Sequence, residues 1–209
     1  MTAPEVELRA VWTHLAGPSH VDALDHLLSR LREPHRHYHT ATHVMWVLRH
    51  VTAITEAATL PPGLHLPEIR LAALFHDAVY DPRSADNEVH SADLAVRRAG
   101  ELGWASPRCT LVRRLVMATA GHHPSGIDEV VLVDADLAIL GAQPNDYSAY
   151  VLGVRAEYAH VDDEQWRTGR SQVLQRFLDT PQLFGTRWGS AREVRARANI
   201  AAELASLGG

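Results

Sequence analysis

The sequence predicts an all-α fold, and three of its features support that prediction. Apolar residues recur mainly at spacings of three and four, which is the period of an amphipathic helix. No convincing run alternates apolar and polar residues as a half-buried strand does. Proline and glycine fall between the periodic segments, where helices begin and end. A chain of 209 residues can also bury a core without disulfides or a structural metal ion.

The N-terminal part is expected to hold two helical regions. The first runs roughly over Glu5–Leu31 and is interrupted at Gly17-Pro18. Pro34 closes this region, because proline disfavours the helical conformation of the residue before it. A second helix is expected to begin near Thr40 and to end before Pro61.

The central part is expected to hold three helices. Pro67 suits the first turn of a helix that runs toward His76-Asp77. Another helix is expected over Asp86–Leu102. Ser106-Pro107 is typical of an N-cap followed by proline at the first helical position, and it opens a helix that extends to about Ala120.

A short helix capped by Asp128 is expected to carry Asp134 and Asp136. Within it, Val131–Val133 favours a helix, with a short strand as the alternative. Three more helices are expected near residues 144–160, 162–179 and 190–207. No repeat or linker stands out, so we expect one domain over 1–209, with a core at about 20–142 and C-terminal helices at about 143–207.

Composition narrows the functional classes. Cys109 is the only cysteine, which excludes an internal disulfide and a cysteine-based zinc site and favours a reducing compartment, the cytoplasm. The N-terminal segment does not resemble a secretory signal, and no apolar stretch approaches the ~20 residues that span a bilayer. A net charge of −5 argues against a general nucleic-acid-binding surface. The sequence leaves a homo-oligomer open.

The 14 histidines are the unusual feature of the composition, and they are clustered. Four lie between His35 and His43, and His122 and His123 are adjacent. Histidine is the commonest metal ligand, although any single one is more often an exposed residue or a core residue bonded to the backbone. On a helix, His39 and His43 would share a face, because they are four residues apart.

Acidic residues inside apolar segments add to this pattern. Asp77 follows His76 at the end of an apolar run, and burying its carboxylate is costly unless it is paired or bound to a metal. Asp134 and Asp136 lie in a second apolar run. They are either a metal ligand and a residue that orients a ligand histidine, or a cap and a surface charge.

Together these segments resemble the HD superfamily of metal-dependent phosphohydrolases, in particular its small, poorly characterised, predicted metal-dependent members of about this length. The shared pattern is a first histidine, a His-Asp pair and a later aspartate, in that order and on helices. The resemblance covers roughly residues 5–205. The motifs that carry it are Phe75–Asp81, Asp86–Glu88 with Ser91-Ala92, Asp134–Gly141, Arg155 with Glu157-Tyr158, and Gly169-Arg170.

The resemblance implies a compact multi-helix HD-domain-like bundle with four metal ligands. These are His43 rather than His39, together with His76, Asp77, and Asp136 rather than Asp134. Two imidazoles and two carboxylates suit one divalent transition metal such as Mn²⁺, Fe²⁺, Co²⁺, Ni²⁺ or Zn²⁺. A second ion and Mg²⁺ remain open. We favour an octahedral ion, because it keeps two positions for water and a phosphate oxygen.

The implied reaction is attack of a metal-activated water on the phosphorus of a nucleotide or another small phosphorylated metabolite. Candidates for binding the phosphoryl oxygens are Arg36, His39 and His122, with His123 as the alternative to His122. Glu88 is the candidate for proton transfer or water positioning, or else a carboxylate stabilised by a helix N-terminus.

Several other family-like positions have less definite roles. Asn87 is expected to bind substrate or to cap a helix. Arg155, Glu157, Tyr158 and Arg170 either contact substrate or form a structural network between helices.

Two other functions remain alternatives. One is a non-catalytic module that senses a ligand through the metal or the pocket. The other is an HD-type di-iron oxygenase, in which His39 and His122 would supply ligands to a second iron.

Overall fold

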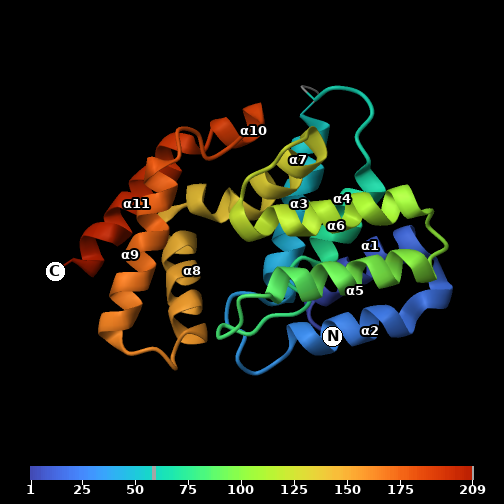
Figure 1. Cartoon of the computed structure of the whole chain (residues 1–209), viewed down its shortest axis with the longest axis horizontal. Helices are drawn as coiled ribbons and strands as arrows, with labels where there is room; N and C mark the ends of the chain where they lie inside the picture. Colours follow the sequence, from blue (N-terminus) through green and yellow to red (C-terminus); the bar gives the residue numbers. More distant parts are fainter. Residues whose placement is uncertain (58–59, 209) are drawn as a thin grey trace.

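The computed structural model describes residues 1–57 and 60–208, so residue 209 of the predicted domain lies outside the described part. The described residues form helices and no strand, which confirms the all-α prediction (Figure 1). The elements are α1 (Ala3–Ala16), η1 (Pro18–His20), α2 (Val21–Leu31), α3 (Ala41–Glu56), α4 (Leu66–Phe75), α5 (Asn87–Glu101), α6 (Ser106–Gly121), α7 (Ile127–Asp136), η2 (Leu137–Gly141), α8 (Pro144–Glu157), α9 (Asp163–Asp179), α10 (Arg187–Ser190) and α11 (Glu193–Leu207), where η marks a 3₁₀ helix.

The predicted N-terminal boundaries are confirmed. Gly17 has a positive φ of 72°, which favours glycine, and it separates α1 from the turn that leads into α2. Thr40 is the N-cap of α3, and its hydroxyl accepts a hydrogen bond from the amide of Thr42 at 3.3 Å. His39 therefore precedes the helix, and the prediction that it shares a helical face with His43 is wrong.

Two predicted caps are also wrong. Ala105 is the N-cap of α6, so Ser106 is already a helical residue. Gly126 is the N-cap of α7, while the carboxylate of Asp128 instead accepts a hydrogen bond from the backbone amide of His65 at 3.0 Å. A carboxylate in the first turn of one helix can accept a hydrogen bond from an unpaired amide at the start of a neighbouring helix. The sequence spacing does not show which amide donates to it. Val131–Val133 is helical, as predicted.

The first and larger apolar cluster lies among α1 to α7. Its largest fully buried side chains include Trp12 and Phe75, whose ring centroids are 5.9 Å apart. Burying a side chain of this size contributes about 1.5–3 kcal/mol. Phe75 is the last residue of α4, so this burial fixes the end of the helix that precedes His76.

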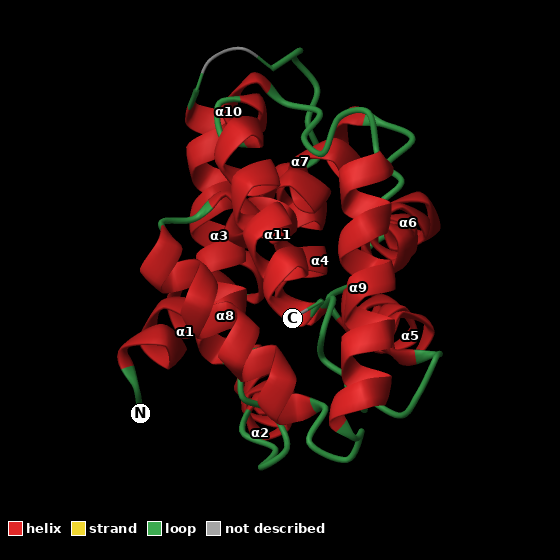
Figure 2. Ribbon diagram, turned by 90° about the vertical axis from the view of Figure 1, so that its left-hand side faces the viewer, coloured by secondary structure: helices red, strands yellow, loops and turns green. Residues whose placement is uncertain are grey.

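The second apolar cluster joins the C-terminal helices to the end of α7. Val133 and Leu137 contribute to it from α7 and η2, while Tyr147, Leu174 and Ile200 contribute from α8, α9 and α11. In Figure 1 these helices, orange to red, lie together at one end of the molecule. Figure 2 turns that end toward the viewer. The C-terminal helices therefore have their own buried apolar cluster, which starts from the segment that carries Asp136.

A buried ion pair ties α8, α9 and α11 together. Glu203 accepts hydrogen bonds from Arg170 Nε at 2.7 Å and Nη2 at 3.0 Å, and from the hydroxyl of Tyr147 at 2.5 Å. Arg170 Nη2 also donates to the hydroxyl of Tyr150 at 3.0 Å. Arg170 and Glu203 thus form a structural network, one of the two roles the sequence left open.

Within the described residues, no helix is long and apolar enough to cross a membrane.

Replacing Glu203 with alanine should lower the free energy of unfolding by about 3–5 kcal/mol, because the Arg170 guanidinium stays buried without its partner. Urea denaturation measures this change. The control is Glu164→Ala, which removes an exposed first-turn acid of α9 and should change the free energy by less than about 0.5 kcal/mol. Equal effects of the two variants would contradict the assigned role.

Candidate metal centre

Two buried histidines face each other through the same ring atom. His43 lies in the first turn of α3, and His76 directly follows the last residue of α4. Their Nε2 atoms are 3.0 Å apart, and the two residues are only 6% and 2% exposed. A packed apolar core would not place two imidazole nitrogens together, so this contact marks a polar centre.

The backbone fixes the orientation of His76. Its Nδ1 lies 2.9 Å from the carbonyl oxygen of Ala73, one helical turn earlier. A carbonyl only accepts hydrogen bonds, so Nδ1 donates, and Nε2 of the neutral ring keeps its lone pair toward His43. Metal-binding histidines commonly have this arrangement, with the second ring nitrogen bonded to a backbone carbonyl.

Two carboxylates complete the cluster. Asp77 Oδ2 lies 3.3 Å from His43 Nε2 and 3.0 Å from His76 Nε2. Asp136 Oδ1 lies 3.2 Å and 3.5 Å from the same two nitrogens. Ligand atoms of His43, His76 and Asp77 all lie within 4.8 Å of one another, and Asp136 approaches both nitrogens without joining that mutually close group. The structure thus brings together the four residues predicted as ligands.

The spacing of these atoms fits a shared metal ion. Two donors each bound at about 2.1 Å lie roughly 3.0 Å apart at a right angle and roughly 3.4 Å apart at the tetrahedral angle. In the cluster, the nitrogen–nitrogen and nitrogen–oxygen separations run from 3.0 to 3.5 Å. The donors are imidazole nitrogen and carboxylate oxygen, a set that suits a divalent transition metal.

Charges within the cluster shift the pKa of all four side chains. Burial lowers the pKa of His43 and His76, but the carboxylates of Asp77 and Asp136 outweigh it and raise both. Burial likewise raises the pKa of each acid, but the adjacent histidines hold the pKa of Asp77 and of Asp136 well below the usual range. Both acids are therefore carboxylates near neutral pH, and they attract positive charge.

Asp134 and Asp136 have different surroundings, although both come from the end of α7. Asp134 accepts hydrogen bonds from the amide of Gly185 at 2.8 Å and from the amide and hydroxyl of Thr186 at 2.7 and 2.6 Å. It fixes the loop before α10 and does not contact the histidine pair. Asp136, the residue the family resemblance favours, is the one beside His43 and His76.

His122 reaches the cluster from an unusual backbone conformation. It ends α6 with a φ of 54°, and among the described residues it is the only non-glycine with a positive φ. This conformation costs about 1 kcal/mol or more for a residue with a Cβ atom. Its Nε2 lies 3.6 Å from Asp136 Oδ2. His123, the alternative, is exposed, and the ion-pair contact with Asp136 comes from His122. The geometry therefore favours His122.

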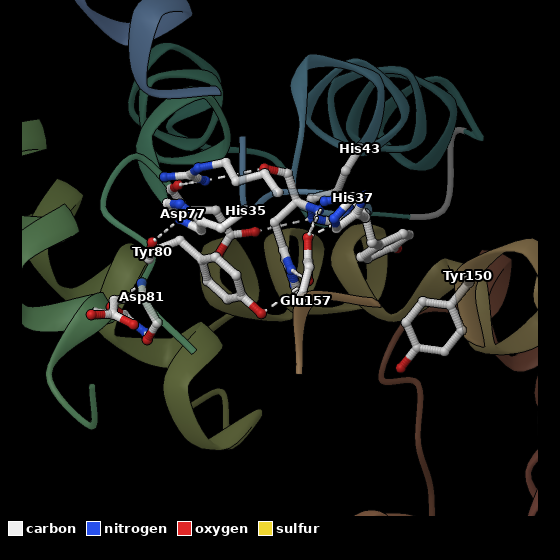
Figure 3. A network of polar contacts seen from close by, with 12 residues as sticks. His35, His37, His43, Asp77, Tyr80, Asp81, Tyr150 and Glu157 are labelled. Atoms are coloured by element: carbon white, nitrogen blue, oxygen red, sulfur yellow. Dashed lines mark hydrogen bonds and ion pairs between the residues drawn. The ribbon is translucent and has the colours of Figure 1, made fainter. Parts of the chain in front are cut away.

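Glu157, at the end of α8, shapes the loop that carries His39 (Figure 3). One carboxylate oxygen accepts the amides of His37, Tyr38 and His39 at 2.8 to 2.9 Å. The other lies 2.7 Å from His39 Nδ1 and accepts the Tyr80 hydroxyl at 2.9 Å. Burial alone would raise the pKa of Glu157, but the bonds from His39 and the amides lower it to about 2. Its ionised carboxylate thus positions His39 beside the centre.

The guanidinium of Arg36, which was predicted to bind phosphoryl oxygens, is occupied by protein partners in this structure. Its guanidinium is buried and donates to Glu33 Oε2 at 3.0 Å and to the carbonyls of His39, Asp77 and Ala78 at 2.7 to 3.2 Å. It is a positioning residue that joins the His39 loop to the turn after His76. The sequence indicates a cation near the site. It does not show that backbone carbonyls accept the hydrogen bonds of this guanidinium.

Asn87 and Glu88 are the first two residues of α5, and their side chains differ in their hydrogen bonds. The Asn87 amide group accepts from the amide of Asp81 at 2.9 Å and donates to its carbonyl at 2.8 Å, so it stabilises the preceding loop. Asn87 therefore has a structural role, and it also lines the cavity, so its predicted substrate contact stays a prediction. Glu88 lines the cavity too, and within the described residues no group donates a hydrogen bond to its carboxylate.

Arg155 and Tyr158 also contribute to local structure. Arg155 donates to the carbonyl of Tyr158 at 2.9 Å and to Asp163 at 2.7 Å, which fixes the turn between α8 and α9. Tyr158 lines the cavity.

The cluster lies at a cavity of about 940 Å³. Its lining includes four of the predicted site residues besides the four ligands: His39, Asn87, Glu88 and His122. Tyr158 and Arg170 line it as well. Clefts that bind small molecules usually measure about 300–1,000 Å³, so this cavity admits a metabolite beside the metal centre.

Sequence reasoning gave no role to Tyr80. Its hydroxyl donates to Glu157, and its ring centroid lies 4.3 Å from that of His39. Its position within the Phe75–Asp81 motif was the available signal. Only the fold shows that α8 brings Glu157 to this tyrosine.

Comparisons with known proteins add no assignment. No family model matches the sequence, no curated protein matches it, and no solved structure matches the fold. The resemblance to the HD superfamily therefore stays a prediction.

The two aspartates of α7 should separate metal binding from stability. Asp136→Ala should weaken Mn²⁺ or Zn²⁺ binding by at least about tenfold, as measured by calorimetry. Asp134→Ala should lower the free energy of unfolding by about 2–3 kcal/mol in urea, because it leaves the amides of Gly185 and Thr186 unpaired. The reverse pattern would make Asp134 the ligand and contradict the assignment.

Proposed function

We propose that this protein is a metal-dependent phosphohydrolase of the HD type that cleaves a phosphoester of a nucleotide or another small phosphorylated metabolite. The observation that carries the proposal is a pair of imidazole nitrogens 3.0 Å apart, with two carboxylates that each lie 3.0 to 3.5 Å from both nitrogens, at the wall of a cavity of about 940 Å³. The ordered sequence motifs that resemble the HD superfamily support it independently.

The metal ligands in this proposal are His43, His76, Asp77 and Asp136. A divalent ion there supplies Lewis acidity, which makes water more acidic and polarises a phosphoryl oxygen. The chain's own residues then have to place the substrate and move protons around it.

Three side chains of the cavity suit these tasks. The Glu157 carboxylate holds His39 by Nδ1, so the Nε2 atom of His39 is left for a substrate oxygen or a proton. His122, held beside Asp136, binds a second phosphoryl oxygen. Within the described part of the chain no group donates to the Glu88 carboxylate, and in this proposal it positions water or accepts its proton.

A phosphatase panel tests the proposal. The full chain, treated with chelator and reloaded with Mn²⁺, is assayed with nucleoside mono-, di- and triphosphates and with simple phosphomonoesters. We expect turnover of at least one class that is lost on chelation and restored by the metal. Metal and phosphate binding without turnover would instead indicate a sensor module, and two bound irons without turnover would indicate the oxygenase.

His122→Gly gives the sharpest variant for this assay, because glycine relieves the left-handed backbone and should leave unfolding unchanged or raise its free energy by up to about 1 kcal/mol. Turnover should still fall about 100-fold or more. The neighbouring variant His123→Ala is the matched control and should keep activity within about threefold. Equal activity of His122→Gly and wild type would remove His122 from the mechanism.

A further inference from the structure

The cavity has two chemically different sides. The metal cluster, His39 and His122 form one side, from the segments around α3, α4, α6 and α7. The other side comes from α8 and α9, both of which lie at the C-terminal end of the molecule (Figure 1). A phosphoryl group would contact only the first side. The second side is then available to the rest of the substrate.

One face of α9 lines this second side. Trp166, Gly169, Arg170, Val173 and Phe177 all border the cavity, and their spacings of three, one, three and four place them on one helical face. We call this set the α9 wall. Apart from Arg170, whose guanidinium is bonded to Glu203 and Tyr150, the wall offers aromatic and apolar surface. Gln165 and Arg176 add two polar side chains of α9 to the cavity lining beside it.

The wall is not simply part of the core. Only Arg170 and Leu174 of α9 are buried, and Leu174 packs into the second apolar cluster. Trp166 and Val173 are half-buried and belong to neither apolar cluster of the described residues. Both residues border the cavity, and the Trp166 ring also packs against the Tyr158 ring, with the centroids 5.6 Å apart. An apolar ligand group that covers this surface removes it from water, which favours binding.

Ring contacts connect this side directly to the metal cluster. The Phe177 ring centroid lies 5.6 Å from that of His122. On the α8 side, Tyr150 lies 4.8 Å from Tyr38, which lies 4.8 Å from His43. A group bonded to a phosphorus atom at the cluster would therefore lie against aromatic side chains.

Gly169 leaves room at the centre of the wall. A Cβ atom added there would meet nothing within 4 Å, and the residue lies inside α9. Glycine in a helix interior costs about 1 kcal/mol relative to alanine, and no packing contact at this position requires it. The open space is what a bulky ligand group would use.

From these observations we propose that the α9 wall binds the leaving group of the substrate, and that the substrate class is phosphomonoesters whose alcohol carries a bulky, ring-containing apolar body. This inference rests on the proposed function for the reaction itself, but the binding surface can be tested without turnover.

Gly169→Leu tests the wall, because a Cβ atom there meets nothing within 4 Å and the rest of the leucine side chain adds bulk at the cavity lining. The matched control is Gly100→Leu in α5, where a Cβ also meets nothing within 4 Å and which does not line the cavity. Both variants replace a helical glycine with a better helix former, so both should fold.

The kinetic arm compares 1-naphthyl phosphate with glycerol phosphate in the Mn²⁺-loaded full chain. Gly169→Leu should lower kcat/KM for 1-naphthyl phosphate by about tenfold or more and change that for glycerol phosphate by less than about threefold. Gly100→Leu should change neither. Equal losses with both substrates, or no loss with 1-naphthyl phosphate, would overturn the proposal.

A binding arm separates this proposal from the proposed function. Calorimetry with the non-hydrolysable 1-naphthylphosphonate and methylphosphonate should show about tenfold tighter binding of the naphthyl compound, and Gly169→Leu should abolish the difference. If no phosphoester is cleaved but this preference holds, the phosphohydrolase proposal fails and the wall proposal stands. Equal binding of both phosphonates would overturn the wall proposal, whatever the enzyme hydrolyses.

Discussion

The contact on which the rest of the site depends is the approach of two imidazole nitrogens, His43 Nε2 and His76 Nε2, to 3.0 Å. Lone pairs at this distance repel each other unless positive charge lies between or on them, and Asp77 and Asp136 concentrate that charge at the same point. The His76 ring cannot turn away without losing its bond to the Ala73 carbonyl. The divalent ion that we propose would satisfy all four groups together.

Buried charges outside the cluster hold it in shape. Glu157 fixes the loop of His39, Arg36 joins that loop to the turn after His76, and Asp134 fixes the loop before α10. Each bonds mainly to backbone groups of segments far away in sequence, and removing such a group leaves several buried donors or acceptors unpaired. The positions of the four cluster residues therefore depend on residues outside the cluster.

Helical periodicity and proline and glycine boundaries predicted the all-α fold and nearly all of its elements, because those signals are local. The family resemblance, rather than spacing, singled out His43 and Asp136, and the structure places both in the cluster. The roles of Arg36, Asn87 and Asp128 were predicted wrongly or left open, because their partners come from segments that only the fold brings near. The α9 wall lies on one face of a helix that the sequence predicts. No sequence signal, however, distinguishes a helical face that lines a cavity from one that packs into a core.

The most direct test of the metal centre is the metal content of the full chain purified without chelator, measured by mass spectrometry beside His76→Ala. We expect about one divalent transition-metal ion per chain, which is lost on dialysis against chelator and regained from Mn²⁺ or Zn²⁺. We expect no such ion in His76→Ala. A folded wild-type protein that neither contains nor takes up such an ion would contradict the proposed metal centre. Equal metal content in the variant would also contradict it, because the ion would then lie elsewhere.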